Sequence, residues 1–206
     1  MRQPEPIWIS FEDEDPPSRR TLDAAILGRL PQARRALVRL TLRLPRRSGL
    51  RQALLRRSVL QVQGAWMRGD FELALGQYHG DVVLTTSNVD ALARLDFETT
   101  YRGRNGVREF VQTYQGAFSD PSYEPKWLVD LGGNTFVMLL HHSVRGRASG
   151  IEVEQLSAHR VELRDGLVVR EEVFVTARRG DLEPVARAVG IDPAELASRR
   201  AVERAG

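Results

Sequence analysis

Two ionisable side chains, His159 and Glu172, stand out because a predicted turn would place them side by side. Residues 151–176 alternate between apolar and polar side chains on both sides of Asp165-Gly166. Asp-Gly between two such runs favours a two-residue hairpin turn, because both turn positions must tolerate positive φ. The turn fixes the register and predicts that His159 faces Glu172. A carboxylate beside an imidazole fixes its tautomer and raises its basicity, so His159 is a candidate general base and Glu172 its orienting partner.

The same register places further side chains beside this pair. It predicts that Val161 faces Arg170 and that Leu163 faces Val168, so this face is apolar near the turn and ionisable further away. Arg170 could bind a substrate carboxylate or an oxyanion, or it could only neutralise Glu172. The His–Glu pair also has a purely structural interpretation, in which it closes the sheet as a satisfied cross-strand pair.

Aromatic side chains on predicted inner faces would form the wall of a pocket around the pair. Trp66 and Tyr114 lie on the apolar stripes of two predicted helices, where they serve core packing first and ligand shape second. Glu154 would enter the pocket only if a β-bulge near Leu156 shifted the alternation. The predicted substrate-binding residues are Trp66, Tyr101, Phe110, Tyr114, Glu154, Arg170 and Phe174.

Composition limits the classes of protein and of site. The chain has 206 residues, enough for one well-buried domain with an appendage, and it contains no cysteine. Disulfides, thiolate nucleophiles and cysteine-ligated metals are therefore excluded. No run of about 18 uncharged apolar residues occurs, so we expect no membrane-spanning helix and a cytoplasmic location. A metal would need three convergent ligands, and the helices lack the His–Glu spacing to supply them, so we predict neither a metal nor a cofactor.

Basic charge is concentrated in one segment. Residues 19–68 hold thirteen arginines against Asp23, a net charge of +12, whereas residues 1–18 carry −4 and residues 69–206 carry −5. The mildly acidic body gives no indication of nucleic-acid binding. The basic helical segment 21–47 could lie on an anionic membrane or an acidic partner, or it could pack as an arm on the body or on a second subunit. Its broken apolar face favours packing.

The order of predicted elements indicates an α+β fold. Two helices precede a short strand, a third helix follows, and four long strands with tight connections come next. This order is typical of helices packed on the concave face of a curved, mostly antiparallel sheet, which together enclose a cone with a pocket at its open end. The predicted elements are a helix over 50–68, a short helix capped by Asp70, a strand over 82–86, an irregular loop over 87–103, a helix over 106–118 capped by Asn105, strands over 126–131 and 135–144, and the hairpin. The predicted segments are an acidic flexible tail and basic helical arm over 1–50, a domain over 51–190, and a C-terminal helical tail over 191–206.

Four stretches of the chain resemble the SnoaL-like branch of the nuclear transport factor 2-like superfamily, in the order and spacing of that family. They are RRSVLQVQGAWMRGDFELALGQYHGDV at 56–82, YRGRNGVREFV at 101–111, GRASGIEVEQ at 146–155 and LRDGLVVREEVF at 163–174. The resemblance covers about two-thirds of the chain and implies a cone fold that often forms homodimers. The family it resembles includes polyketide cyclases, ketosteroid isomerase-like and epoxide hydrolase-like enzymes, and binding modules, so the fold does not fix the function.

No catalytic signature of these enzymes aligns with this chain. The cyclase-like members pair an acid/base carboxylate with a histidine, which His159 and Glu172 match by residue type only. One hypothesis is therefore a cofactor-independent isomerase or cyclase acting by proton abstraction on a small apolar, carbonyl-bearing ligand. The other is a non-catalytic ligand-binding or dimerisation module. A weaker hypothesis adds membrane-surface contact through the basic arm.

Overall fold

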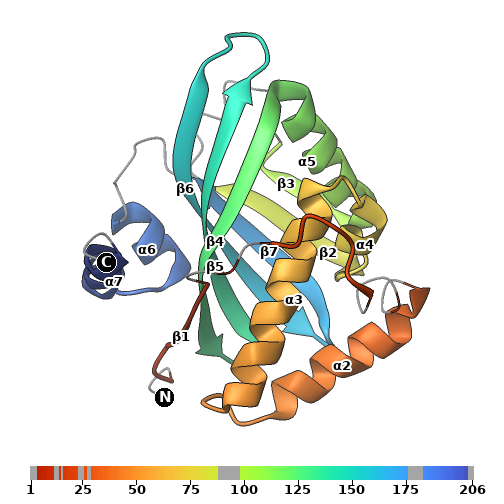
Figure 1. The fold of residues 1–206 in the computed structure, drawn as a ribbon, viewed down its shortest axis with the longest axis vertical. Coiled ribbons are helices and arrows are strands. Elements are labelled where there is room, and N and C mark those ends of the chain that lie inside the picture. Colours follow the sequence, from red (N-terminus) through yellow and green to blue (C-terminus); the bar gives the residue numbers. More distant parts are fainter. Residues whose placement is uncertain are drawn as a thin grey trace.

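The described residues of the computed structural model form a seven-stranded sheet with helices on both faces (Figure 1). They are residues 4–11, 14, 16–22, 26, 29–87, 98–175 and 183–203. The strands are β1 (Ile7–Ser10), β2 (Tyr78–Ser87), β3 (Thr100–Arg102), β4 (Phe118–Gly132), β5 (Thr135–Gly146), β6 (Glu152–Arg164) and β7 (Leu167–Val175). The helices are α2 (Pro31–Arg43), α3 (Gly49–Met67), α4 (Phe71–Leu75), α5 (Gly103–Ala117), α6 (Glu183–Val189) and α7 (Pro193–Glu203).

The sheet is curved and mostly antiparallel, as the sequence predicts. Its strand order is β1-β4-β5-β6-β7-β2-β3, and only the β2–β7 pair is parallel. Figure 1 shows α3, α4 and α5 on one side of the sheet and α6 and α7 on the other. Apolar side chains of β4, β5 and β6 pack against α6 and α7 on the convex side, whereas those of β2 and β7 pack against α5 on the concave side. The predicted α+β cone is therefore confirmed.

The N-terminal tail contributes a strand, so the prediction of a flexible tail is wrong over residues 7–10. Strand β1 pairs with β4, with Ile9 opposite Leu128. Ile9 and Phe11 are only 2% and 3% exposed, and they join the core beneath α3. The sequence IWISF alternates its apolar side chains in the strand pattern, and burial of its apolar face favours the ordered edge strand.

The strand that follows α5 is longer than predicted. β4 begins at Phe118 and continues through Pro121 and Pro125, whereas the sequence predicted a strand over 126–131. Its register with β5 shifts between Ser119 and Ser122 and again after Pro125. A proline cannot donate to the ladder, and bulges are where a strand tolerates one. Helix α5 also begins at Gly103, so the predicted cap at Asn105 is wrong. Of the loop predicted over 87–103, residues 88–97 lie outside the described residues.

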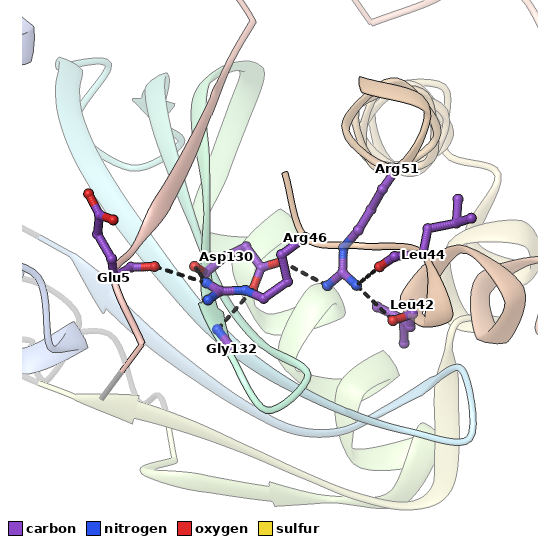
Figure 2. A network of polar contacts seen from close by, with 7 residues as sticks. All are labelled: Glu5, Leu42, Leu44, Arg46, Arg51, Asp130 and Gly132. Atoms are coloured by element: carbon purple, nitrogen blue, oxygen red, sulfur yellow. Dashed lines mark hydrogen bonds and ion pairs between the residues drawn. The ribbon is translucent and has the colours of Figure 1, made fainter. Parts of the chain in front are cut away.

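A buried ion pair connects the N-terminal segments to the sheet (Figure 2). Arg51 on α3 and Asp130 on β4 are 4% and 1% exposed, and their Nη2 and Oδ2 atoms are 2.7 Å apart. Arg51 Nη1 also donates to the carbonyl oxygen of Leu42, 2.7 Å away at the end of α2. Arg46 Nε donates to the other oxygen of Asp130 at 3.1 Å, and its Nη2 donates to the carbonyl of Glu5. This network therefore holds the segment before β1 and the α2–α3 connection against one strand.

Candidate functional site

A β-bulge in the hairpin determines which glutamate reaches His159. The Asp165-Gly166 turn forms as predicted, and Leu163 lies opposite Val168. The register then shifts, so that Glu162 lies opposite Arg170 and Val169 is the extra residue of β7. The extra residue reverses the alternation beyond it. The predicted pairing of His159 with Glu172 and that of Val161 with Arg170 are therefore wrong, and Glu171 takes the inner position.

His159, Glu171 and Tyr78 form a hydrogen-bonded chain across three strands. His159 Nδ1 lies 2.8 Å from Glu171 Oε1, and the Tyr78 hydroxyl donates to Glu171 Oε2 at 2.6 Å. Burial raises the pKa of Tyr78 well above its ordinary value, and the charge of Glu171 raises it further, so the phenol keeps its proton. With both carboxylate oxygens accepting, His159 carries its proton on Nδ1. Its Nε2 has no hydrogen-bond partner among the described residues and is the basic atom.

These three residues line a cavity of about 530 Å³ between the concave face of the sheet and the helices. Trp66 on α3 and Phe110 and Tyr114 on α5 contribute to its wall, as predicted. The remaining wall is mainly aliphatic, with Val62, Leu84, Val107, Leu140 and Val173 among its residues. A cavity of this size with a mainly apolar lining is typical of a site for a small, largely apolar molecule.

Five of the predicted site residues lie outside this lining. Arg170 is 53% exposed and donates to Glu172 Oε1 at 3.2 Å, because the bulge turns both side chains away from the cavity. For the same reason Phe174 packs in the convex cluster with α6 and α7. Glu154 is exposed, because β6 pairs with β5 without a bulge near Leu156.

The fifth, Tyr101, lies behind the wall. It is 3% exposed, packs edge-on against Phe110 with ring centroids 5.4 Å apart, and accepts a hydrogen bond from the Glu98 amide at 3.0 Å. Burial raises the pKa of Tyr101. Its short strand β3 pairs with β2 at the edge of the sheet, which explains why it supports the cavity wall from outside.

The structure adds residues that the sequence did not select. They are Tyr78, whose hydroxyl donates to Glu171, and Gln63 on α3. Gln63 is 5% exposed, lines the cavity and donates to Met138 Sδ at 3.4 Å, a weak acceptor. Met138 is the strand partner of His159, so the Gln63 amide lies near the histidine.

Of the adjacent histidines on β5, His142 faces the cavity and His141 faces outward. His142 is 4% exposed, and burial, followed by the nearby His159 and His141, lowers its pKa to about 3. His141 is 34% exposed beside the Glu124 carboxylate, 3.7 Å away. The alternation of a strand gives two adjacent residues opposite faces, but the sequence alone does not say which faces inward.

Helix α2 of the basic arm covers one end of the cavity. Its inner residues Pro31, Arg34, Arg35 and Val38 contribute to the lining. Arg34 donates to the carbonyl of Leu73 at 2.8 Å, and Arg35 donates to that of Asp165 at 2.9 Å. Burial lowers the pKa of Arg34. The arm is thus packed on the body of the domain, the arrangement that the sequence favoured.

A curved α+β cone with a chemically equipped internal cavity is the architecture of the nuclear transport factor 2-like superfamily. The SnoaL-like domain profile matches residues 59–171, which is more than half of the chain. The chain belongs to the SnoaL-like family.

Solved structures share this fold at low sequence identity. A nuclear transport factor 2-like protein of unknown function from Burkholderia pseudomallei is 19% identical over 65% of this chain and 95% of its own, with a TM-score of 0.52. One from Burkholderia thailandensis is 18% identical over 66% and 96%, with a TM-score of 0.50. TerC, co-crystallised with polyporic acid, is 20% identical over 57% and 87%, with a TM-score of 0.50. The comparison with curated proteins gives no match. None of the helices in the described ranges has the length and apolar character needed to cross a membrane.

Proposed function

We propose that this protein is an enzyme that abstracts a proton from a small, largely apolar, carbonyl-bearing substrate, as an isomerase or a cyclase does. The observation that carries the proposal is the Tyr78–Glu171–His159 chain, which ends within a cavity of about 530 Å³ in an imidazole nitrogen that has no partner in the described part of the chain. A general base needs an acceptor atom within reach of the substrate and a second group that holds its ring in place. His159 and Glu171 meet both requirements.

The proton moves from a substrate carbon to His159. The C–H bond next to the carbonyl breaks, His159 Nε2 takes the proton, and the electron pair of that bond moves toward the carbonyl oxygen to give an enolate. Glu171 stabilises the imidazolium, and Tyr78 holds the carboxylate in position. Return of the proton to a different carbon completes an isomerisation. In a cyclisation, the enolate carbon attacks a second carbonyl and closes a ring, and the imidazolium gives its proton to the alkoxide oxygen that forms.

Gln63 is the candidate donor to the enolate oxygen. Its buried amide contacts only the weak acceptor Met138 Sδ in the described structure, so a stronger acceptor would displace that contact at small cost. A donor aimed at the oxygen where charge develops is the arrangement that stabilises such a transition state. The apolar wall favours a mostly hydrocarbon substrate, and the co-crystal of TerC, a protein of this fold, with polyporic acid supports a small-molecule ligand.

A proton-exchange assay tests this proposal without knowledge of the natural substrate. The probe is 2-tetralone in D₂O, and the measurement is deuterium incorporation beside its carbonyl by NMR. Wild type should exceed the buffer rate. His159→Gln should lower the protein-dependent rate by roughly 10²-fold or more, and Glu171→Gln by about tenfold, because general-base catalysis is worth about 10²–10⁴.

Glu172→Gln is the matched control, because Glu172 is the adjacent residue on the opposite face. Its exchange rate should equal that of wild type. Equal losses in both glutamate variants would point to a general charge effect and contradict the assigned roles. A wild type that binds 2-tetralone without exchange would leave the ligand-binding module as the function. The homodimer, the cytoplasmic location and a weak membrane-surface contact through the basic arm stay predictions.

A further inference from the structure

His142 is the polar member of an otherwise apolar row on β5. Phe136, Met138, Leu140 and His142 alternate along the strand and all line the cavity. His142 is 4% exposed, and neither ring nitrogen has a hydrogen-bond partner among the described protein atoms. A buried polar group without a partner is unfavourable, so natural proteins keep few of them. A ligand group is therefore the natural partner to consider.

The ring of His142 is uncharged at neutral pH, because burial lowers its pKa to about 3. A neutral imidazole offers one N–H donor and one acceptor nitrogen. A ligand carbonyl can satisfy only the donor. A hydroxyl group can donate to the acceptor nitrogen and also accept a hydrogen bond from another side chain.

Tyr123 provides that second side chain. It is the strand partner of His142, and the two rings meet edge-on with centroids 5.8 Å apart. The side chains of Tyr114 and Tyr123 share a hydrogen bond, which raises the pKa of Tyr114 and acts to lower that of Tyr123. The Tyr114 hydroxyl is therefore the donor and the Tyr123 hydroxyl is the acceptor. Burial raises the pKa of Tyr123 to about 12, so it keeps its own proton available for an acceptor.

His142 and His159 lie at separate points on the same inner face. His159 is the strand partner of Met138, four residues before His142 on β5. Four residues of strand span about 13 Å along the backbone. The side chains still approach closely enough for His159 to contribute to the lowered pKa of His142, so the two imidazoles are distinct polar positions in one cavity. On the inner face, Leu140 and its buried strand partner Ser157 lie between them.

We propose that His142 and Tyr123 form a second subsite that binds an uncharged hydroxyl group, such as a phenol, at a position of the ligand other than the one that meets His159. The ligand hydroxyl donates to the acceptor nitrogen of His142 and accepts from the Tyr123 hydroxyl. This inference rests on the proposed function for the orientation of the substrate, whose reacting carbon lies at His159. It assigns the substrate class as apolar carbonyl compounds that carry a hydroxyl group away from the reacting carbon.

The test compares two probes of the same shape, 2-naphthol and 2-methoxynaphthalene. Both oxygens can accept a hydrogen bond, but only the naphthol can donate one. Isothermal titration calorimetry on wild type should give a Kd about tenfold lower for 2-naphthol, the value of one good hydrogen bond to a buried acceptor. His142→Phe should bring the two Kd values to within about twofold of each other, the low end of the same range.

His141→Phe is the matched control, because His141 is the neighbouring histidine on the outer face. It should keep the tenfold preference. His159→Gln should keep it as well, although the same variant loses proton exchange if the proposed function holds. If wild type shows no proton exchange but prefers 2-naphthol, only the proposed function is removed. If wild type shows proton exchange but no preference for 2-naphthol, only the subsite is removed.

Three results would overturn the subsite. They are no preference in wild type, a preference that survives His142→Phe, and a preference that His159→Gln abolishes. If His142→Phe does not fold, the subsite is tested instead by the ring ¹⁵N resonances of His142 in the wild-type protein. The acceptor nitrogen should shift on addition of 2-naphthol and stay unchanged with 2-methoxynaphthalene, and identical responses to the two probes would contradict the subsite.

Discussion

His142 links the polarity of the cavity to the stability of the protein. In the folded state burial lowers its pKa to about 3, whereas an exposed histidine titrates near 6.5. Between these values the unfolded chain binds a proton that the folded protein does not. The free energy of unfolding therefore falls as the pH is lowered through this window, by about 1.4 kcal/mol for each pH unit below the unfolded pKa.

We expect His142→Phe to reduce this acid sensitivity. Urea unfolding at pH 7.5, 6.0 and 5.0 measures the free energy of unfolding for wild type and the variant, and carboxylates contribute equally to both. The stability of wild type relative to the variant should fall by roughly 1 kcal/mol between pH 6 and pH 5. His141→Phe, on the outer face of the same strand, is the matched control and should retain the acid sensitivity that the buried His142 confers. Parallel curves for wild type and His142→Phe would contradict a neutral buried His142.

At the level of secondary-structure elements, the bulge in β7 shows where sequence reasoning reached its limit. The Asp-Gly turn predicted the hairpin and brought His159 to the candidate site. Val168 and Val169 are both valine, and Glu171 and Glu172 are both glutamate, so the pattern fits either register. Packing of the three-dimensional sheet selects between them, and no glycine marks the extra residue. Sequence alternation therefore predicted the two strands of the hairpin and the position of His159, but not which of the two glutamates shares its face.

Residues distant in the sequence were still less predictable. Tyr78 reaches Glu171 through the parallel pairing of β2 with β7, a contact across 93 positions. Hydrophobic periodicity reports the buried face of one element and carries no information on its strand partner. Trp66 and Tyr114 were predicted correctly as lining, because each belongs to a helix whose apolar stripe can face only the sheet. The wall residues could therefore be predicted from the sequence. The contact between Tyr78 and Glu171 could not, because it depends on which strands pair.

The contact between α2 and the hairpin turn offers a test at this level. Gly166 has φ +79°, and a Cβ there would lie 2.6 Å from the carbonyl oxygen of Arg35 on α2. Gly133 has φ +58° in another turn, with no atom within 4 Å of such a Cβ. Gly133→Ala should therefore show only backbone strain, about 1 kcal/mol. Gly166→Ala should lose roughly 1–3 kcal/mol more, because α2 must move.

Urea unfolding measures the two stabilities, and hydrogen exchange over residues 31–43 reports on α2. Exchange should accelerate in Gly166→Ala and remain at the wild-type rate in Gly133→Ala. Equal stabilities and equal exchange in the two variants would show that the turn does not hold the helix. Faster exchange would also identify the turn as the part of the hairpin that keeps α2 over the cavity.

For the molecule as a whole, the network around Asp130 joins the parts that enclose the cavity. Arg51 belongs to α3, its carbonyl acceptor Leu42 to the end of α2, and Arg46 to the connection between these helices. Through Arg46 the network also reaches Glu5, just before β1. One carboxylate on β4 thus fixes both the end of the helix that covers the cavity and the segment before the edge strand (Figure 2).

Asp130→Asn should destabilise the protein by about 3–5 kcal/mol, because it leaves the arginine charge of Arg51 buried without its counter-ion. Urea unfolding gives the magnitude. Hydrogen exchange should accelerate together in β1 and α2, since both depend on the same carboxylate.

Arg47→Ala is the matched control: its ion pair with Glu5 is exposed, 77% on both sides, so the loss should stay within about 1 kcal/mol. A loss in Asp130→Asn no larger than in the control would mean that apolar packing alone closes the cavity, and acceleration in only one segment would mean that the two are held independently.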